Sequence, residues 1–378
     1  MGRASTPPDT SVVREVGGYS VRISRAPDDP DWDDFLESTP MGNHAQASCW
    51  GRARASIGWK PIRVVVSADG RVVAGVQMLT RPLPATGDAG FVFRGPVIPD
   101  GQPELAELVF DEMMALGKTN DVQYLVVQPP RGGDWMLDKL ARLGLRLGAF
   151  DIQHASTVCI DLQPDVDQLL KNLSRQRRQN VRTAEKGGIN VRRGTEADLP
   201  TFNRLKDLHS ARLGYSRRDE GYYTELWHAL APRGNAVLFV AEYEGEPVSA
   251  LLALPFGVNC THLERPWSGE HGELRPNELL EWEVIKWAKS EGYRFTDLGG
   301  LPDVIAEAIR SGQEVPRDPQ YSAPLFKLKW GGEVVVDPHS YDYVYNPLLR
   351  FGYRCIPHRV KTSEWMRGLV SKSDQTGS

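Results

Sequence analysis

Basic side chains are concentrated between residues 171 and 186 of a chain whose formal net charge is −4. In a helix, steps of three or four residues place five of these cations on one stripe: Lys171, Arg175, Arg178, Arg182 and Lys186. Such a stripe could bind a polyphosphate or a nucleic-acid backbone. The plainer interpretation is a solvated helix face, which charge alone favours.

Metal and disulfide chemistry are not indicated by the other reactive side chains. Cys49, Cys159, Cys260 and Cys355 lie far apart and form no CxxC pair, so we expect ordinary buried thiols. The eight histidines show no HExxH or HxH spacing. We therefore expect neither a metal nor a cofactor.

The length of the chain, 378 residues with 40% hydrophobic content, predicts two domains. No apolar run approaches the roughly 18 to 20 residues of a spanning helix, and the N-terminus has no hydrophobic signal core, so we expect a cytoplasmic protein. Residues 1–17 and 370–378 are polar and rich in small side chains, and we expect them to be disordered.

The predicted elements follow one α/β (α+β) plan twice. Helices between residues 32 and 59 precede a hairpin at 63–79, whose Asp-Gly turn favours a tight connection. A strand at 91–93, a helix at 103–118 and a strand at 122–128 follow. A helix is also expected over 135–147.

The second half has a strand at 158–162, one long basic helix over 166–186, and a hairpin at 237–252. A helix at 277–290 and a strand at 294–298 follow, as in the first half. Gly70 corresponds to Gly245 at an offset of 175 residues. Chance similarity of two hairpins is the alternative, but the recurrence favours a duplicated module with its binding site in the cleft between the copies.

Seven motifs follow one another along the chain: Gln46–Arg54 followed by Gly58-Trp59, Phe93–Val97, Arg178–Gly188, Ala211–Tyr215, Pro276–Trp282, Asp297–Leu301 and Leu325–Gly332. Together they resemble the FemABX family of peptidyltransferases. Members use aminoacyl-tRNA to add amino acids to the stem peptide of peptidoglycan precursors. The resemblance implies two tandem modules similar to the GNAT acyltransferase fold, at residues 18–157 and 158–332. It further implies that C-terminal strands within 333–360 complete the first module.

The implied reaction forms a tetrahedral intermediate that bears an oxyanion, which a cation or hydrogen-bond donor should face. The resemblance assigns this role to Lys327 and suggests that Phe326 stacks on the terminal adenine of the tRNA. Without the motif, residues 326–330 would be interpreted as an alternating strand with core aromatics and solvated lysines.

The same resemblance implies that Arg54 and Arg212 bind the diphosphate of the acceptor, with Trp50 and Tyr215 beside them. Arg54 stands where the family usually has lysine, so a planar bidentate donor replaces a point charge. As a lone residue, each arginine would more often be a surface cation. His262, Glu264 and Trp267 lie in a strand that the resemblance places along the acceptor pocket, and its composition departs from the family's.

The attacking amine must also lose a proton. Relatives often end the strand at 122–128 with an aspartate, where this chain has Gln128, and glutamine accepts no proton at neutral pH. Either the tRNA itself carries the proton, or His262 or Glu264 substitutes.

The expected partners are aminoacyl-tRNA and a lipid-linked or UDP-linked muropeptide, with peripheral membrane contact if the precursor is lipid-linked. Candidate tRNA-binding residues are Arg175, Arg178, Arg182 and Lys329, although part of the stripe could instead support the fold. The sequence does not determine the donated amino acid or the oligomeric state.

Three alternatives remain open. A coenzyme A acyltransferase would usually carry a Q/R-x-x-G-x-G/A turn, which follows neither hairpin. A nucleic-acid-binding protein would more often have an overall positive charge. A tRNA-dependent enzyme acting on a small-molecule amine differs only in its acceptor.

Overall fold

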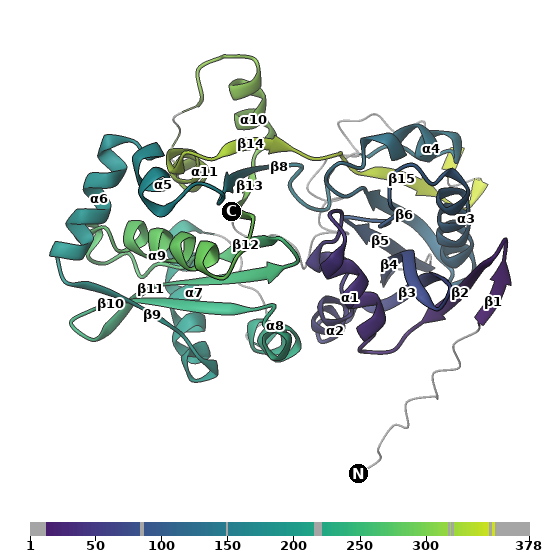
Figure 1. Cartoon of the computed structure of the whole chain (residues 1–378), viewed down its shortest axis with the longest axis horizontal. Helices are drawn as coiled ribbons and strands as arrows, with labels where there is room; N and C mark the ends of the chain where they lie inside the picture. Colours follow the sequence, from purple (N-terminus) through teal and green to yellow (C-terminus); the bar gives the residue numbers. More distant parts are fainter. Residues whose placement is uncertain are drawn as a thin grey trace, which may run out of the picture. The chain divides into compact units, whose positions relative to one another are not determined.

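The computed structural model describes residues 13–83, 87–148, 150–214, 221–316, 318, 321–347 and 350–351. These residues form two compact units, each built on one sheet (Figure 1). One contains the described residues up to Ile152 and those from Pro338 onward, and the other contains Gln153–Asp337. The division falls at Ile152 and Asp337, where the sequence suggested 157 and 332.

The first unit has an eight-stranded sheet in the order β1-β2-β3-β4-β5-β6-β15-β7. Its strands are β1 (Val13–Val16), β2 (Tyr19–Ser24), β3 (Lys60–Ala68), β4 (Arg71–Leu83), β5 (Gly87–Phe93), β6 (Val122–Gln128), β7 (Arg146–Leu147) and β15 (Tyr341–Val344). Only the β5–β6 pair is parallel among the described strands of this sheet. Its helices are α1 (Pro30–Ser38), α2 (Ser48–Ala55), α3 (Pro103–Thr119) and α4 (Leu137–Arg142).

Alternation along β3 sends successive side chains to opposite faces of this sheet. Val64 and Val66 share a core with Val109 and Met113 of α3. On the opposite face, Gly75 of β4 lies against the ring of Trp32 from α1, because a Cβ there would be 2.8 Å from that ring. The predicted Asp69-Gly70 turn joins β3 to β4, with positive φ at both residues.

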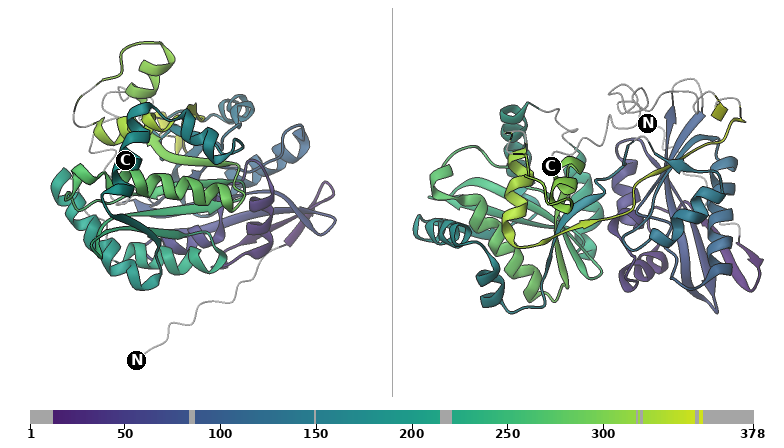
Figure 2. Two further views of the ribbon diagram at one scale, coloured as in Figure 1. Left: turned by 60° about the vertical axis from the view of Figure 1, so that its left-hand side comes forward. Right: turned by 90° about the horizontal axis from the view of Figure 1, so that it is seen from above.

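The second unit repeats this plan in a seven-stranded sheet, ordered β14-β8-β13-β12-β11-β10-β9. Figure 2 shows the same ribbon from two further directions. The strands of this unit are β8 (Ser156–Asp161), β9 (Ile189–Arg193), β10 (Val237–Tyr243), β11 (Glu246–Phe256), β12 (Asn259–Glu264), β13 (Phe295–Leu301) and β14 (Glu333–Val336). Its helices are α5 (Val166–Asn172), α6 (Arg175–Lys186), α7 (Leu199–Leu213), α8 (Tyr222–Leu230), α9 (Pro276–Ser290), α10 (Asp303–Arg310) and α11 (Ser322–Lys327). The β12–α9–β13 crossover joins parallel strands, as β5–α3–β6 does in the first unit.

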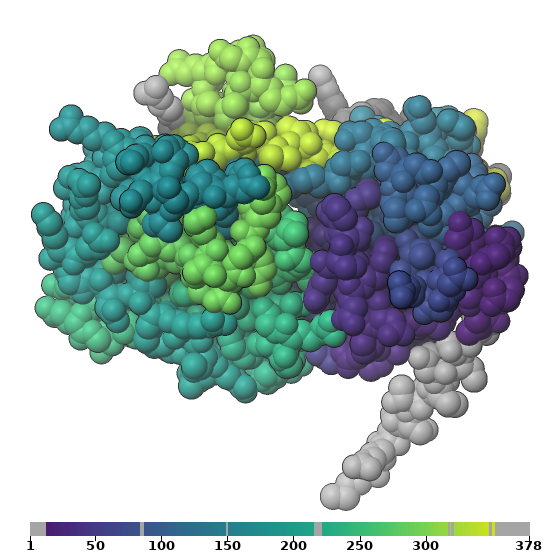
Figure 3. All heavy atoms as spheres, in the orientation of Figure 1, coloured from purple at the N-terminus to yellow at the C-terminus, as the bar shows by residue number. Residues whose placement is uncertain are grey.

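The long basic helix predicted over 166–186 is wrong, because the chain breaks it into α5 and α6. Leu173 has an extended backbone, and Ser174 caps α6 by accepting a hydrogen bond from the Arg177 amide at 3.1 Å. Lys171 therefore belongs to a different helix from Arg175, Arg178, Arg182 and Lys186. The teal atoms of α5 and α6 lie at the surface of the second unit (Figure 3).

Two further expectations need correction. The helix expected over 135–147 ends at Arg142, and Arg146–Leu147 forms β7 instead. Of the C-terminal strands expected to complete the first unit, β15 pairs with β6 and β7, but β14 pairs with β8 in the second sheet. The left-handed Gly331, with φ of 73°, reverses the chain just before β14.

No helix in the described part of the chain is long and apolar enough to cross a bilayer. Cys49, Cys159 and Cys260 are buried and form no disulfide, as expected, and burial raises the pKa of Cys260 to about 12. Cys355, residues 1–12 and residues 370–378 lie outside the described residues. The disorder expected up to residue 17 is wrong for Val13–Val16, which form β1 and pair with β2.

Candidate functional site

In the first unit, Trp50 and Arg54 lie one turn apart on α2 and pack against each other. The Arg54 guanidinium carbon is 4.8 Å from the centre of the Trp50 ring and 5.9 Å from that of Phe93. Arg54 is only 4% exposed and Trp50 2%. Arg54 is therefore not the solvated surface cation that its sequence context alone would suggest.

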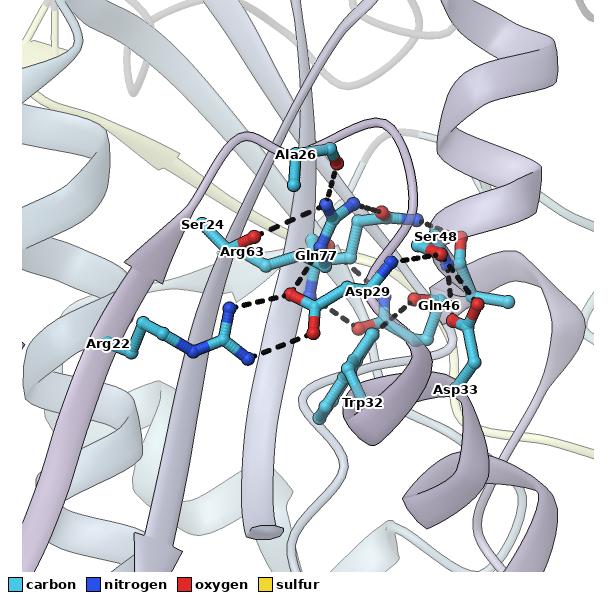
Figure 4. A network of polar contacts seen from close by, with 11 residues as sticks. Arg22, Ser24, Ala26, Asp29, Trp32, Asp33, Gln46, Ser48, Arg63 and Gln77 are labelled. Carbon is cyan, nitrogen blue, oxygen red and sulfur yellow. Dashed lines mark hydrogen bonds and ion pairs between the residues drawn. The ribbon is translucent and has the colours of Figure 1, made fainter. Parts of the chain in front are cut away.

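The start of α2 is held by a buried polar network (Figure 4). Asp33 accepts hydrogen bonds from the backbone amide of Ser48 at 2.6 Å and from its hydroxyl at 2.5 Å. Gln46 donates to the carbonyl of Phe93 at 2.7 Å and accepts from the amide of Gln77 at 2.7 Å. These contacts fix α2 against β4 and β5, and thereby the position of Arg54.

A second part of the network joins Asp29, the residue before α1, to arginines of β2 and β3 (Figure 4). Arg63 donates to the Gln77 side chain at 2.8 Å and forms an ion pair with Asp29 at 3.6 Å, and Asp29 also pairs with Arg22 at 2.9 Å. Burial raises the pKa of Asp29, but Arg22 and Ser24 outweigh it, so the net direction is downward. Asp29 and both arginines are paired with one another within the first unit, so we assign this part of the network a structural role.

In the second unit, Lys327 ends α11 and is only 5% exposed. Its Nζ donates to the carbonyl oxygen of Gly300 at 2.8 Å. The strand considered for residues 326–330 is wrong: the chain is helical to Lys327 and continues as a 3₁₀ turn at Leu328–Trp330. A left-handed Gly331 then ends the turn.

The environment of Lys327 changes its acidity. Burial, followed by the positive charge of Arg265, lowers the pKa of Lys327 to about 8, against opposing effects from Asp297, Glu281 and Glu264. A protonated amine has three N–H donors. Among the described residues, Nζ donates to the carbonyl oxygen of Gly300, which leaves two N–H groups for a ligand.

Phe326, next to Lys327, contacts two arginines. The guanidinium carbon of Arg265 lies 4.1 Å from its ring centre and that of Arg177 lies 4.5 Å away. Arg177 also lies 4.8 Å from the ring of Trp330 and pairs with Glu278 at 3.2 Å. Stacking of a tRNA base on Phe326 stays a prediction.

Sequence reasoning missed Arg177 and Arg265 as parts of this site. Arg177 stands beside the predicted stripe, but it shares the buried face of α6 with Val181 and Ala184. That spacing of four and three residues was readable from the sequence. The role of Arg265 was not, because it depends on a partner 16 residues away, Glu281 of α9.

His262 and Glu264, suggested as bases, are both buried and already engaged. His262 shares a hydrogen bond through Nδ1 with Glu281 at 2.7 Å, and through Nε2 with Thr296 at 3.0 Å. Glu264 accepts from Lys206 at 2.7 Å and from the Tyr223 hydroxyl at 2.6 Å. These contacts favour structural roles for both side chains.

Gln128 is also fully buried, at the end of β6. Its side-chain amide donates to the carbonyl of Pro338 at 3.3 Å. The amide therefore contacts the segment that leads to β15.

Arg212 and Trp267 are brought together in the second unit. The Arg212 guanidinium carbon lies 4.3 Å from the Trp267 ring centre, and Nη2 donates to Nδ1 of His209 at 2.9 Å. Burial, then the charges of Arg212 and Lys206, lower the pKa of His209 to about 4, so it is neutral and can accept this bond. Tyr215 lies outside the described residues.

The candidate tRNA-binding residues differ in availability. Arg175, Arg182 and Lys329 are exposed. Arg178 instead donates to the carbonyls of Lys171, at 2.8 Å, and Leu173, and so supports the end of α5. Arg178 therefore has a structural role of the kind considered for part of the stripe.

Residues 28–246 match the FemAB family. The chain belongs to the FemAB family. Its expected fold class, two tandem GNAT-like α/β modules, is confirmed. Its similarity to curated glycyltransferases shows that it is a transferase.

The most similar curated relatives include the lipid II:glycine glycyltransferase of Staphylococcus aureus strain MRSA252. It is 27% identical over 411 residues, covering 87% of this chain and 94% of the relative. The Staphylococcus saprophyticus enzyme of the same name is 27% identical over 228 residues, covering 57% and 55%.

Solved structures show the same fold. FemX matches with a TM-score of 0.76 at 21% identity, covering 86% of this chain and 98% of FemX. A tandem GNAT protein from the clavulanic acid biosynthesis pathway matches with a TM-score of 0.51 at 12% identity, covering 84% and 95%.

Proposed function

We propose that this FemAB-family protein is an aminoacyltransferase that moves an amino acid from aminoacyl-tRNA to an amine of a peptidoglycan precursor. The observation that carries this proposal is the buried Lys327, whose amine faces a backbone carbonyl and retains donors for a ligand. The names of the glycyltransferase relatives, which act on lipid II, support the precursor as acceptor.

In this proposal the acceptor amine attacks the ester carbonyl of the charged tRNA. A C–N bond forms, the carbonyl oxygen becomes an oxyanion, and the C–O bond to the terminal ribose then breaks. Protonated Lys327 stabilises the oxyanion as it develops, in a dehydrated environment where a fixed charge acts strongly. The ribose oxygen leaves with a proton, while the acceptor nitrogen loses one.

Phosphate recognition is proposed for Arg212 in the second unit and for Arg54 in the first. Both guanidiniums lie over an indole ring, which fixes their planes. A fixed planar guanidinium can form two parallel hydrogen bonds to a phosphate.

The test is an in vitro transfer assay with the full chain. Transfer RNAs charged with glycine, alanine, serine or lysine are incubated with lipid II or with the nucleotide-linked precursor, and new amides are detected by mass spectrometry. We expect an RNase-sensitive product with one acceptor. Acyl transfer from acetyl coenzyme A without any need for RNA, or transfer only to a small-molecule amine, would contradict the proposal.

A further inference from the structure

The short helix α11 has little intrinsic means of holding Lys327 in place. It contains six residues, and a helix of that length is unstable alone because nucleation costs more than its few hydrogen bonds return. Its orientation must come from side-chain contacts. Phe326 provides them, through Arg265, Arg177 and the ring of Trp330 at 5.8 Å.

Arg265 is itself held in place by Glu281 of α9. It donates to Oε2 of Glu281, whose other oxygen, Oε1, shares a hydrogen bond with His262 Nδ1 at 2.7 Å. Glu281 has no exposed surface. A fully buried carboxylate with two partners allows the guanidinium little freedom, because any movement would leave the charge unpaired.

We infer that Arg265 is a positioning residue for Lys327: held by Glu281, it fixes Phe326 and places a second positive charge near the Lys327 amine. This inference rests on the role proposed above for Lys327. It extends that role, because it names the group that controls both the location and the charge of the amine.

The charges around the amine support the inference. Arg265 opposes protonation of Lys327, while Asp297, Glu281 and Glu264 favour it. Together with burial they give Lys327 a pKa of about 8, so the amine is mostly protonated near neutral pH and can still exchange a proton. Without Arg265, the same pocket would hold a more basic amine.

Arg177 offers a matched control. Its guanidinium contacts the same ring, at 4.5 Å against 4.1 Å for Arg265, and it also pairs with a glutamate of α9. Yet it is not among the charges that act most strongly on Lys327. Arg177→Gln therefore removes a comparable stacking contact without removing the nearby charge.

The first experiment measures the Lys327 amine itself and does not need activity. The ¹³Cε signal of Lys327, assigned through Lys327→Arg, is titrated by NMR in the full chain. We expect the midpoint to move to higher pH in Arg265→Gln, to stay close to its original value in Arg265→Lys and Arg177→Gln, and to move to lower pH in Glu281→Gln. Opposite directions for Arg265→Gln and Glu281→Gln exclude simple entry of water, which would raise both midpoints.

A midpoint unchanged by Arg265→Gln, or one that moves as far in Arg177→Gln, would overturn the inference. If Arg265→Gln does not fold, the Arg265→Lys and Glu281→Gln titrations still decide the matter: an unchanged midpoint in Glu281→Gln would count against a charge network around the amine.

The second experiment measures turnover. We expect Arg265→Gln to lower kcat by about ten- to a hundred-fold with little change in the KM of either substrate, as for a displaced reacting group. Arg265→Lys should recover the alkaline limb of the pH profile but only part of kcat. Failure of the proposed function would leave the unmodified protein inactive on these substrates while the NMR result stands, so the two failures are distinguishable.

Discussion

Lys327 donates a hydrogen bond from Nζ to the carbonyl oxygen of Gly300 at 2.8 Å, and this contact fixes the amine at the end of β13. A carbonyl partner does not neutralise the charge, as a carboxylate would. The contact therefore leaves the amine the positive charge that its proposed role at the oxyanion requires.

Removal of the Lys327 amine should reduce turnover more than binding. We expect Lys327→Ala to lower kcat by about a hundred- to a thousand-fold, the usual effect of losing one oxyanion donor, with a small change in acceptor KM. Arg54→Ala should do the reverse, because phosphate contacts act in the ground state as well. Steady-state kinetics check this, and equal losses of binding in both variants would contradict the assignments.

Gly299 leaves space for the Lys327 side chain. It has φ of +88°, and a Cβ there would lie 3.4 Å from Lys327 Nζ and 3.2 Å from the carbonyl oxygen of His262. Gly292→Ala is a matched control, since Gly292 has φ of +87° and nothing within 4 Å of its virtual Cβ.

Gly299→Ala and Gly292→Ala should each lower the free energy of unfolding by about 1 to 2 kcal/mol, because both glycines have a left-handed backbone conformation. We expect only Gly299→Ala to lower kcat as well. Urea unfolding and kinetics, measured side by side, check this. A similar fall in kcat for Gly292→Ala would show that strain alone is responsible.

Glu281 should make stability depend on pH in acid. Burial raises its pKa, but Arg265 and His262 outweigh burial and hold it at about 2, below the ordinary 4.5. The unfolded chain therefore takes up this proton first. The stabilising contribution is complete above about pH 4.5 and is lost as the pH falls through about 2.

We expect Glu281→Gln to flatten the pH dependence of the unfolding free energy in this range by roughly 3 kcal/mol, at about 1.36 kcal/mol for each pKa unit. Urea unfolding at several pH values measures it. The control is Glu333→Gln, a change at an exposed glutamate of β14. Parallel curves for the two variants would contradict this role.

His209 should orient Arg212 for its ligand. With its pKa lowered to about 4 it stays neutral well into acid, so its hydrogen bond from Arg212 persists down to that region and is lost when the ring is protonated. We expect His209→Phe to raise the acceptor KM by about two- to ten-fold, the worth of one hydrogen bond of about 1 kcal/mol, with kcat little changed.

His209→Asn, whose side chain still carries an acceptor, should recover part of the acceptor KM. Acceptor titrations at constant tRNA concentration measure the effect. A fall in kcat without a change in KM would instead place His209 with the reacting groups.

Changes at the exposed cations of α6 test whether this helix contacts tRNA. If Arg175 and Arg182 contact tRNA phosphates, the double change to glutamate should weaken aminoacyl-tRNA binding and reduce the salt slope by about 1 for each lost contact. Arg178 is left intact, because it supports α5. The control for net charge is Lys118→Glu combined with Arg142→Glu, a double change at exposed cations of α3 and α4. An unchanged KM for tRNA in the α6 variant would remove α6 from recognition.

Local patterns determined much of the fold. Alternating valines around Asp69-Gly70, and the corresponding hairpin 175 residues later, were enough to predict β3–β4 and β10–β11, since strand pairing across a short turn is a local property. The break between α5 and α6 was missed, although Ser174 is a good N-cap. A residue's capping preference does not by itself outweigh a continuous helical pattern.

The sequence by itself determined the family and pointed to Lys327 as the candidate catalytic residue, because the order and spacing of motifs can be read without knowledge of the fold. Only the tertiary structure decided what surrounds that amine. Arg177, Arg265 and Glu281 come from α6, the segment after β12, and α9, and no spacing along the chain reveals that they meet at Phe326. Burial and charge act through space, so the pKa of Lys327 and the engagement of His262 and Glu264 follow from packing alone.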